Sequence, residues 1–202
     1  MISKNFSAAT ARLSIEKIKE GQQPIITDNH RYILSFNGEI FNYKNIIKKY
    51  SFSPVDINSE IKLLGKLFQL KGSKFINEIE GQFAISIYDV IEDKLYLFRD
   101  RFGIRPLFYK EKNNSFIYAS EIKSIGAYGE EILKTSLNSI ASTALFWSNI
   151  NNLTSFEDVK QLQPGCYLVH SKNKTEVKRY WNNPLSFNEN NNKPRNFIEI
   201  LK

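Results

Sequence analysis

The chain has 202 residues, of which 42% are hydrophobic and 24% are charged, and these values are typical of a folded globular domain. They exclude a wholly disordered chain, and no apolar run approaches the roughly 18–20 residues that a membrane-spanning helix needs. The first residues also lack the apolar core of a signal peptide. The single cysteine, Cys166, excludes an internal disulfide framework and a multi-cysteine metal site. The sequence therefore predicts a cytoplasmic protein that does not contact membranes.

The net charge of +7 raises the question of a nucleic-acid partner. Nucleic-acid-binding proteins gather Arg and Lys on one stripe or patch. Here the 28 basic residues are 21 Lys and 7 Arg, and the lysines are spread along the chain with only short pairs such as Lys48-Lys49. The charge alone therefore does not favour binding to nucleic acid.

The first half of the chain is predicted to hold one strand and two helices, which are Tyr32–Phe36, Tyr43–Tyr50 and Glu60–Leu70. Asn58 and Ser59 precede the second helix, and both residue types are good N-caps. Gly72 follows it and is predicted to end it, because glycine is common just beyond the last turn of a helix.

The second half is predicted to hold one helix and three strand pairs. The helix is Leu137–Phe146, and the pairs are Phe83–Tyr88 with Lys94–Arg99, Leu107–Tyr109 with Phe116–Ala119, and Gly165–His170 with Glu176–Tyr180. Successive hairpins favour an α+β fold with mainly antiparallel sheets over a doubly wound parallel sheet.

The end of the chain has a different composition. The Asn-rich stretch 188–196 is typical of a solvated linker, and Phe197–Lys202 resembles the first turn of a helix. The sequence therefore predicts one domain over residues 1–182, followed over residues 183–202 by a linker and the start of a helix.

The triplet Asn37-Gly38-Glu39 follows the first predicted strand and leads into a helix. At a strand end, an Asn side chain and the next N–H can point the same way, and two such donors make an oxyanion hole. Glu39 adds a negative charge that suits an ammonium group. The alternative interpretation is an ordinary Asn-Gly turn.

Three other features of the sequence have a structural interpretation. In its structural interpretation, the segment RDRFGIRPLFY at residues 99–109 is a rigid connection between strands. Arg99 and Asp100 then pair with each other or with the backbone. Arg12 is able to hold a carboxylate through two parallel bonds, or is a surface residue. Cys166 is predicted to be a buried structural thiol, because no neighbouring His or helix N-terminus lowers its pKa.

Taken together, these segments resemble the glutaminase domain of asparagine synthetases, a class II glutamine amidotransferase of the N-terminal-nucleophile fold. The resemblance runs in order through ARLSI at 11–15, GQQP at 21–24, FNGEIFNY at 36–43, SEIKLL at 59–64, EGQFAISIYD at 80–89, FRDRFGIRPLFY at 98–109, YASEIKSI at 118–125, LQPGCYL at 162–168 and RYW at 179–181. It implies a four-layer αββα sandwich with mainly antiparallel sheets.

The resemblance also implies roles for individual residues. Arg12 matches the residue that grips the α-carboxylate of glutamine, and Leu13 and Ile15 match residues that contribute backbone contacts. Asn37-Gly38 matches the oxyanion hole. Glu39 matches a residue that holds the amino group of glutamine.

The sequence departs from the family pattern at two places. The family nucleophile is a Cys at the mature N-terminus, whereas this chain opens Met1-Ile2-Ser3, and the opening strand of the fold is also missing. Asn58 stands where the family usually has an Asp that binds the substrate ammonium, a change expected to weaken glutamine binding about tenfold. The resemblance therefore predicts weak glutamine binding and no glutaminase activity for this chain alone.

Cofactors and partners follow from the same resemblance. ATP and Mg belong to the family's C-terminal synthetase domain, whose S-G-G-x-D-S loop does not occur here, so no cofactor is expected in this chain. The expected partners are glutamine and either a separate synthetase chain, which amidates aspartate or a related carboxylate, or a second copy. The alternative is a non-catalytic module that binds glutamine or docks on a partner.

Overall fold

A computed structural model describes residues 5–11, 22–112, 115–128, 133–147, 153–172 and 174–183. The elements in chain order are β1 (Ile25–Ile26), β2 (Tyr32–Ile40), α1 (Tyr43–Lys49), α2 (Glu60–Lys71), the 3-10 helix η1 (Gly72–Glu78), β3 (Gly81–Asp89), β4 (Lys94–Arg99), β5 (Phe108–Lys112), β6 (Ser115–Ala119), α3 (Ile122–Gly126), α4 (Leu137–Phe146), β7 (Lys160–Gln161), β8 (Cys166–Ser171) and β9 (Lys174–Arg179).

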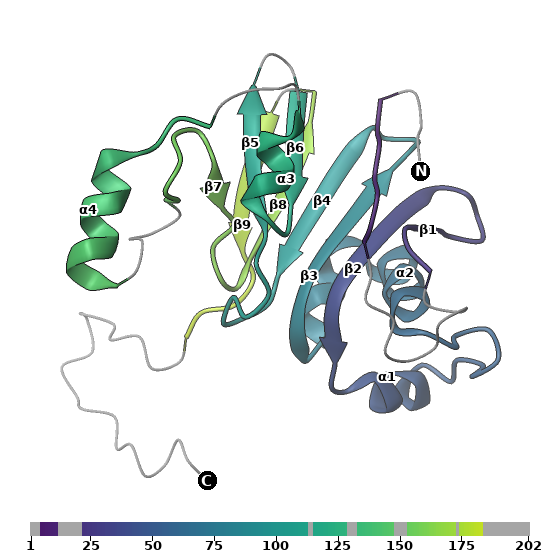
Figure 1. Ribbon diagram of the computed structural model, residues 1–202. Coiled ribbons are helices and arrows are strands. Elements are labelled where there is room, and N and C mark those ends of the chain that lie inside the picture. Colours follow the sequence, from purple (N-terminus) through teal and green to yellow (C-terminus); the bar gives the residue numbers. More distant parts are fainter. Residues whose placement is uncertain are drawn as a thin grey trace, which may run out of the picture.

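The strands form two sheets. The larger sheet has the order β1-β2-β3-β4-β8-β9 and the smaller has the order β6-β5-β7, and the strand pairs are antiparallel. Figure 1 shows α1 and α2 beside β2 and β3, while the small sheet lies on the other side with α3 next to it. The prediction of an α+β fold with mainly antiparallel sheets is confirmed.

One face of the large sheet is apolar and is covered by α2. Alternate residues of β2 point to this face, because side chains alternate along a strand. They meet a stripe of α2 whose members recur every three or four residues, as the sequence predicted. The main residues of this core are Leu34, Phe36, Ile40, Ile61, Leu64, Leu67, Phe68, Phe75, Phe83, Ile85 and Phe98.

The opposite face of the large sheet packs against the small sheet. The second core contains Ile33, Tyr88, Leu95, Leu97 and Leu168 of the large sheet together with Leu107, Tyr109 and Leu162. This core covers only part of the face. The remaining part carries polar side chains of β2 and β3, and it borders the site described below.

The structure corrects the predicted end of the first strand. β2 does not stop at Phe36 but continues to Ile40, and Gly38 pairs with Phe83 inside the ladder. At Gly38 the backbone φ is +151°, and a Cβ would lie 2.0 Å from the carbonyl oxygen of Gln82. The strand can therefore pass so close to β3 only with glycine here. Asn37-Gly38 is neither a turn nor a strand end.

The start of α2 at Glu60 is as predicted, and of the two predicted caps Ser59 is the N-cap residue, although its side chain makes no capping hydrogen bond. Instead, the carboxylate of Glu60 accepts a hydrogen bond of 2.6 Å from the N–H of Ile40 and ties the helix to the end of β2. Gly72 is the C-cap, as predicted, with a φ of +55°.

Several short elements were not predicted, namely β1, η1, α3 and β7. The first strand of the second predicted pair begins one residue later than predicted, because β5 starts at Phe108 and extends to Lys112. The bounds of β4 and α4 match the predictions. In the described part of the chain, none of the helices has the length and apolar character needed to span a bilayer.

Candidate functional site

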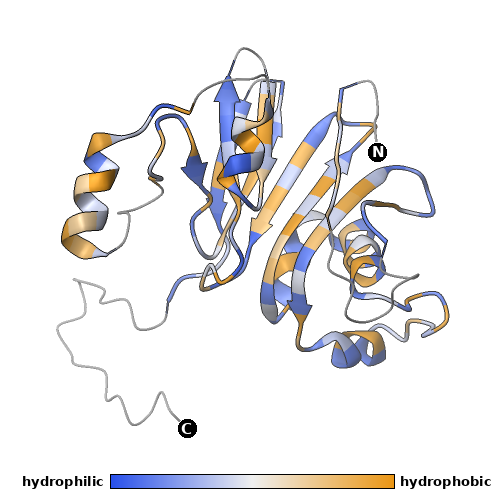
Figure 2. Cartoon of the chain, viewed as in Figure 1, coloured by the Kyte–Doolittle hydropathy of each residue, from blue (hydrophilic) through white to orange (hydrophobic). Residues whose placement is uncertain are grey.

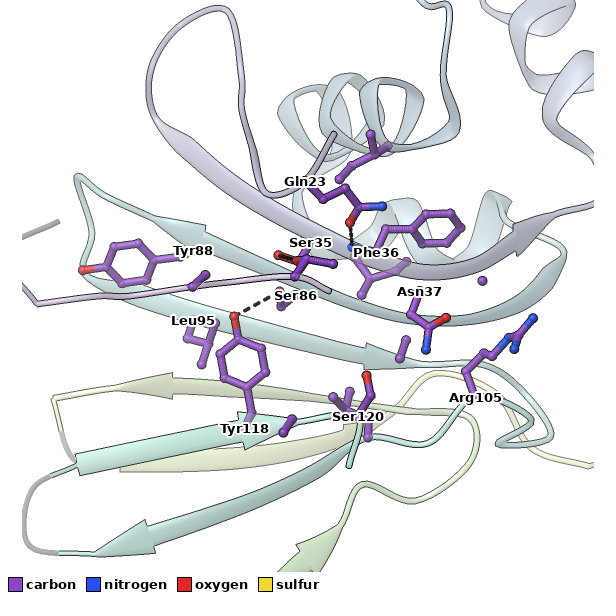
Figure 3. Close-up of a pocket in the computed structure, with 18 of the residues that line it drawn as sticks. Gln23, Ser35, Phe36, Asn37, Ser86, Tyr88, Leu95, Arg105, Tyr118 and Ser120 are labelled. Carbon is purple, nitrogen blue, oxygen red and sulfur yellow. Dashed lines mark hydrogen bonds between the residues drawn. The ribbon is translucent and has the colours of Figure 1, made fainter. Parts of the chain in front are cut away.

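An open groove runs between the uncovered part of the large sheet and strand β6, and its volume is about 2010 Å³. This volume exceeds the roughly 300–1,000 Å³ of a typical small-molecule site, so the groove has room for more than one amino-acid-sized ligand. Figure 3 shows the residues that line it, with β2 and β3 on one side and Tyr118 and Ser120 on the other.

Three polar residues of β2 line the groove. Ser35, Asn37 and Glu39 are two residues apart, and therefore they share one face of the strand. The rise of a strand places neighbouring members of this row about 6.6 Å apart along β2. The side chains of Asn37 and Glu39 are exposed. The strand thus presents an amide and a carboxylate to the same ligand-sized space.

A hydrogen bond joins the two walls of the groove. Ser86 of β3 lies opposite Ser35 in the ladder, and its hydroxyl accepts a hydrogen bond of 3.1 Å from the phenol of Tyr118. Burial raises the pKa of Tyr118. The phenol therefore stays neutral at pH 7 and acts as a hydrogen-bond donor between the sheets (Figure 3).

The segment 5–11 lies along one end of the groove. Phe6 stacks on Tyr88 with ring centroids 4.2 Å apart and also contacts Tyr118. The hydroxyl of Thr10 donates to that of Ser35 at 3.4 Å. These contacts fill the end of the groove nearest Tyr88 and leave Asn37 and Glu39 exposed.

Arg105 lines the groove at the end where Asn37 lies (Figure 3). Its backbone is fixed on both sides, because its N–H donates to Asp100 and its carbonyl accepts from Arg99. Its Nε is buried and makes no hydrogen bond to any part of the chain that the structure describes. Arg105 was not predicted to line the site, although its place in the segment 99–109 was a signal.

The loop that carries Arg105 is built on Asp100, which is fully buried. Its carboxylate accepts hydrogen bonds from four backbone N–H groups, those of Phe83, Phe102, Ile104 and Arg105. Arg99 donates to the carbonyl oxygens of Gly103, Arg105 and Leu162. The structural interpretation of Arg99 and Asp100, pairing with the backbone, is confirmed.

The residues predicted for the site have three different outcomes. Asn37, Gly38 and Glu39 come together in the groove. Asn58 is half-buried before α2 and is not among the residues that line the groove. Arg12, Leu13 and Ile15 lie outside the described residues.

Cys166 is in the second core and not in the groove. It is the first residue of β8, it is 2% exposed, and burial raises the pKa of its thiol. A thiol in such a place is a poor nucleophile. The prediction of a buried structural thiol is therefore confirmed.

His170 also lines the groove and was not predicted to do so. Its ring stacks on Phe116, and its Nδ1 lies 2.8 Å from the hydroxyl of Thr175. Burial lowers the pKa of His170, which favours the neutral ring at pH 7. Within the described ranges, no three His, Cys, Asp or Glu side chains converge as a metal site would require.

The chain resembles known proteins in both sequence and fold. A family model described as "Glutamine amidotransferase domain" matches residues 1–181. The chain belongs to this family. It is homologous to the glutaminase domains of asparagine synthetases, as the resemblance predicted.

Two curated relatives show the extent of the similarity. "Asparagine synthetase [glutamine-hydrolyzing] 2" of Bacillus subtilis (strain 168) is 34% identical over 187 residues, which is 89% of this chain and 25% of that protein. "Asparagine synthetase B [glutamine-hydrolyzing]" of Escherichia coli (strain K12) is 32% identical over 126 residues, which is 61% of this chain and 23% of that protein. The chain thus spans about a quarter of the length of these relatives.

The fold is shared with solved amidotransferases. The glutamine phosphoribosylpyrophosphate amidotransferase from B. subtilis, complexed with ADP and GMP, superposes with a TM-score of 0.54 at 17% identity, covering 81% of this chain and 33% of that one. A second solved structure, the allosteric regulatory enzyme of purine biosynthesis, superposes with a TM-score of 0.55 at 17% identity, covering 81% of this chain and 32% of that one. The predicted N-terminal-nucleophile type of α+β sandwich is confirmed.

Proposed function

We propose that the groove binds glutamine through Asn37 and Glu39. The observation that supports this most directly is the row of polar side chains on one face of β2. Free glutamine carries an ammonium group, a carboxylate and a side-chain amide. Glu39 offers the negative charge for the ammonium group, and the amide N–H groups of Asn37 offer donors for the side-chain carbonyl oxygen.

A cationic side chain is also present for the α-carboxylate of glutamine. Arg105 brings a guanidinium to the end of the groove where Asn37 lies, and arginine is the residue type that pairs best with carboxylates. Family resemblance assigns the same contact to Arg12. The two assignments predict different results for the variant Arg105→Met. This variant weakens glutamine binding if the guanidinium of Arg105 contacts the carboxylate, and leaves binding unchanged if Arg12 makes that contact.

Hydrolysis of glutamine is not part of what we propose for these 202 residues. The sequence has one cysteine, and Cys166 is buried in a core away from the groove. Asn37 and the N–H of Gly38 are a candidate oxyanion hole, which stabilises a tetrahedral intermediate only when a nucleophile attacks. The chain alone is therefore expected to hold glutamine without releasing ammonia.

The longer relatives suggest a wider role. The domain is proposed to work with a synthetase-type partner, on the same or a separate chain, that uses ammonia to amidate aspartate or a related carboxylate in the cytoplasm. ATP and Mg²⁺ would bind to that partner and not to this domain. The large share of each relative that lies outside the matched part supports this proposal.

Calorimetry of the full chain with glutamine tests the proposed site. We expect weak binding of glutamine that is reduced about tenfold by Glu39→Gln, because a charged hydrogen bond is replaced by a neutral one. Glutamate and asparagine serve as ligand controls. Equal affinity of the wild type and both Glu39→Gln and Asn37→Ala variants for glutamine would contradict the site.

An ammonia-release assay with glutamine tests the second part of the proposal. We expect no turnover by the wild type above that of heated protein. Turnover that survives Cys166→Ser would show that another group acts as nucleophile, and turnover that is lost in this variant would show that Cys166 acts. Either result would overturn the proposal of binding without hydrolysis.

A further inference from the structure

Helices α2 and α4 both have serine at the N-cap, but only one of these serines caps its helix. Ser136 precedes α4, and its Oγ accepts a hydrogen bond of 3.3 Å from the N–H of Ser139. Ser59 precedes α2, where its side chain makes no capping hydrogen bond. Serine is one of the best N-cap residues, because its oxygen can satisfy an N–H of the first turn. The hydroxyl of Ser59 is therefore not used in the way its position favours.

The hydroxyl of Ser59 is also buried. Ser59 is 5% exposed, and its Oγ makes no hydrogen bond to any part of the chain that the structure describes. A buried hydroxyl without a partner destabilises a protein, because it has lost its hydrogen bonds to water. Ser59 lines the groove. A ligand in the groove that supplies the missing hydrogen bond would explain why the hydroxyl is left unpaired there.

Ser59 lies at the end of the groove where Glu39 ends the polar row of β2. The carboxylate of Glu60 accepts a hydrogen bond of 2.6 Å from the N–H of Ile40, and this bond joins the start of α2 to the end of β2. Ser59 directly precedes Glu60, and Glu39 directly precedes Ile40. Both Ser59 and Glu39 line the groove, whereas Asn58 does not. The hydroxyl and the carboxylate are therefore available to the same ligand group.

The charges at this end of the groove favour a cationic group of the ligand. Glu39 and Glu60 line it with two carboxylates, and Lys44 of α1 is the lysine that lines it nearby. Figure 2 shows hydrophilic residues on α1, which follows the end of β2. The N-terminus of α2 adds a partial charge of about +0.5, which does not cancel the remaining negative charge. The ammonium group of an amino acid fits this end better than its carboxylate does.

We propose that the hydroxyl of Ser59 accepts a hydrogen bond from the α-ammonium group of glutamine, beside the carboxylate of Glu39. This inference rests on the proposed function, and it adds a residue that selects ligands with an unmodified α-amino group. An ammonium group has three N–H donors, so a carboxylate and a hydroxyl can each accept from a different one. A ligand without the ammonium group leaves Ser59 unpaired and is therefore bound less well.

Thermal melting of the full chain without ligand tests whether the hydroxyl of Ser59 has a structural role instead. We expect Ser59→Ala to melt at or above the temperature of the wild type, because the variant removes a buried polar group that has no partner in the described structure. Ser136→Ala is the matched control, and it should melt about 2–4 °C lower because it loses a capping bond. A Ser59→Ala variant that melts as low as Ser136→Ala would overturn the proposal.

Binding of two ligands by NMR titration tests the contact with the ammonium group. The ligands are glutamine and glutaramate, which is glutamine without its α-amino group. We expect Ser59→Ala to raise the dissociation constant of glutamine about tenfold and to leave that of glutaramate unchanged, while Ser136→Ala binds both as the wild type does. An equal loss for both ligands would show that Ser59 only shapes the groove, and this result would overturn the proposal.

The variant Glu39→Gln separates this inference from the proposed function. If Glu39→Gln weakens glutamine binding and Ser59→Ala does not, the groove binds glutamine as proposed and the role of Ser59 is wrong. If the wild type does not bind glutamine, the proposed function is wrong and the role of Ser59 is wrong with it. If both variants weaken the binding of glutamine but not that of glutaramate, the two residues share the ammonium group.

Discussion

The two faces of the large sheet are built from the same strands but differ in use. The face under α2 is filled with Leu, Ile and Phe side chains that are almost fully buried. The face toward β6 carries Ser35, Asn37 and Glu39 on β2 and Ser86 on β3, and these residues line an open groove. Because side chains alternate along a strand, one sequence supplies both a core and the polar wall of a groove.

This difference teaches where stability and binding can be changed independently. On the apolar face, a smaller side chain leaves a cavity that its neighbours cannot fill. On the groove face, a change at Glu39 removes no buried contact in the described structure, so it should alter only the proposed glutamine site. A change at Gly38 is expected to affect both stability and binding, because Gly38 belongs to the ladder that holds Asn37 and Glu39 in place.

The largest effect is expected from Phe98→Ala on the apolar face. Phe98 is fully buried, and its ring lies 4.9 Å from that of Phe75 and 5.4 Å from that of Tyr167. The free energy of unfolding should fall by about 3–5 kcal/mol, as measured by denaturant titration. Phe41→Ala is the control, since Phe41 is 64% exposed and its loss should cost less than about 0.5 kcal/mol. Similar losses in both variants would contradict the difference between the faces.

A smaller loss, of about 2–3 kcal/mol, is expected from Gly38→Ala. The added Cβ would meet the carbonyl oxygen of Gln82 at 2.0 Å, so β2 and β3 must separate locally. Gly72→Ala is a matched control, because Gly72 also has positive φ but has nothing within 4 Å of a Cβ. Denaturant titration of both variants isolates the effect of the clash from that of the backbone angle. Equal losses would show that close approach is not what requires Gly38.

Glu39→Gln should change binding and leave stability alone. We expect its unfolding free energy to stay within about 0.5 kcal/mol of the wild type, while the dissociation constant for glutamine rises about tenfold. Glu121→Gln is the control, because Glu121 also lines the groove but lies outside β2. If calorimetry shows the same loss for both variants, the groove attracts the ligand only through its overall charge.

The smallest effect is expected from Glu78→Gln in the helical layer. Hydrogen bonds from Lys49 and Lys71 lower the pKa of Glu78 from 4.5 to about 2. A carboxylate whose pKa is lowered by folding stabilises the protein above its unfolded pKa, and this contribution is lost as the pH falls from about 4.5 through 2. The variant should therefore melt at a slightly lower temperature at pH 7, because its free energy of unfolding falls by less than about 1 kcal/mol.

The pH dependence provides the check on Glu78. Melting curves recorded from pH 7 to pH 2 should show the gap between the wild type and Glu78→Gln closing as the pH falls. The exposed neighbour Glu80 gives the control variant Glu80→Gln. A gap that stays constant to pH 2 would show that the ion pairs with Lys49 and Lys71 do not contribute.

Much of the fold was predictable because local patterns and tertiary contacts agree. The apolar stripe of α2, the stop at Gly72 and the hairpin of β3 with β4 were predicted from spacing and residue type. The polar triplet after Phe36, singled out in the sequence, lines the groove. The structural role of Asp100 was weighed as one of two interpretations, since its partners are backbone groups that leave no mark in the sequence.

The errors have a common cause. Asn37-Gly38 has the composition of a turn, but pairing with β3 continues the strand to Ile40, because Gly38 tolerates the close approach. Arg105 and His170 were missed as groove residues because they come from distant parts of the chain.

The sequence by itself determined the alternation of β2, the apolar stripe of α2 and the family to which the chain belongs, because these depend on spacing along the chain. Only the tertiary structure decided which polar groups share the groove and that the apolar residues of α4 face outward. Such facts depend on contacts between residues that are far apart in sequence. The same apolar pattern in α2 and α4 therefore leads to a buried core in one helix and an exposed surface in the other.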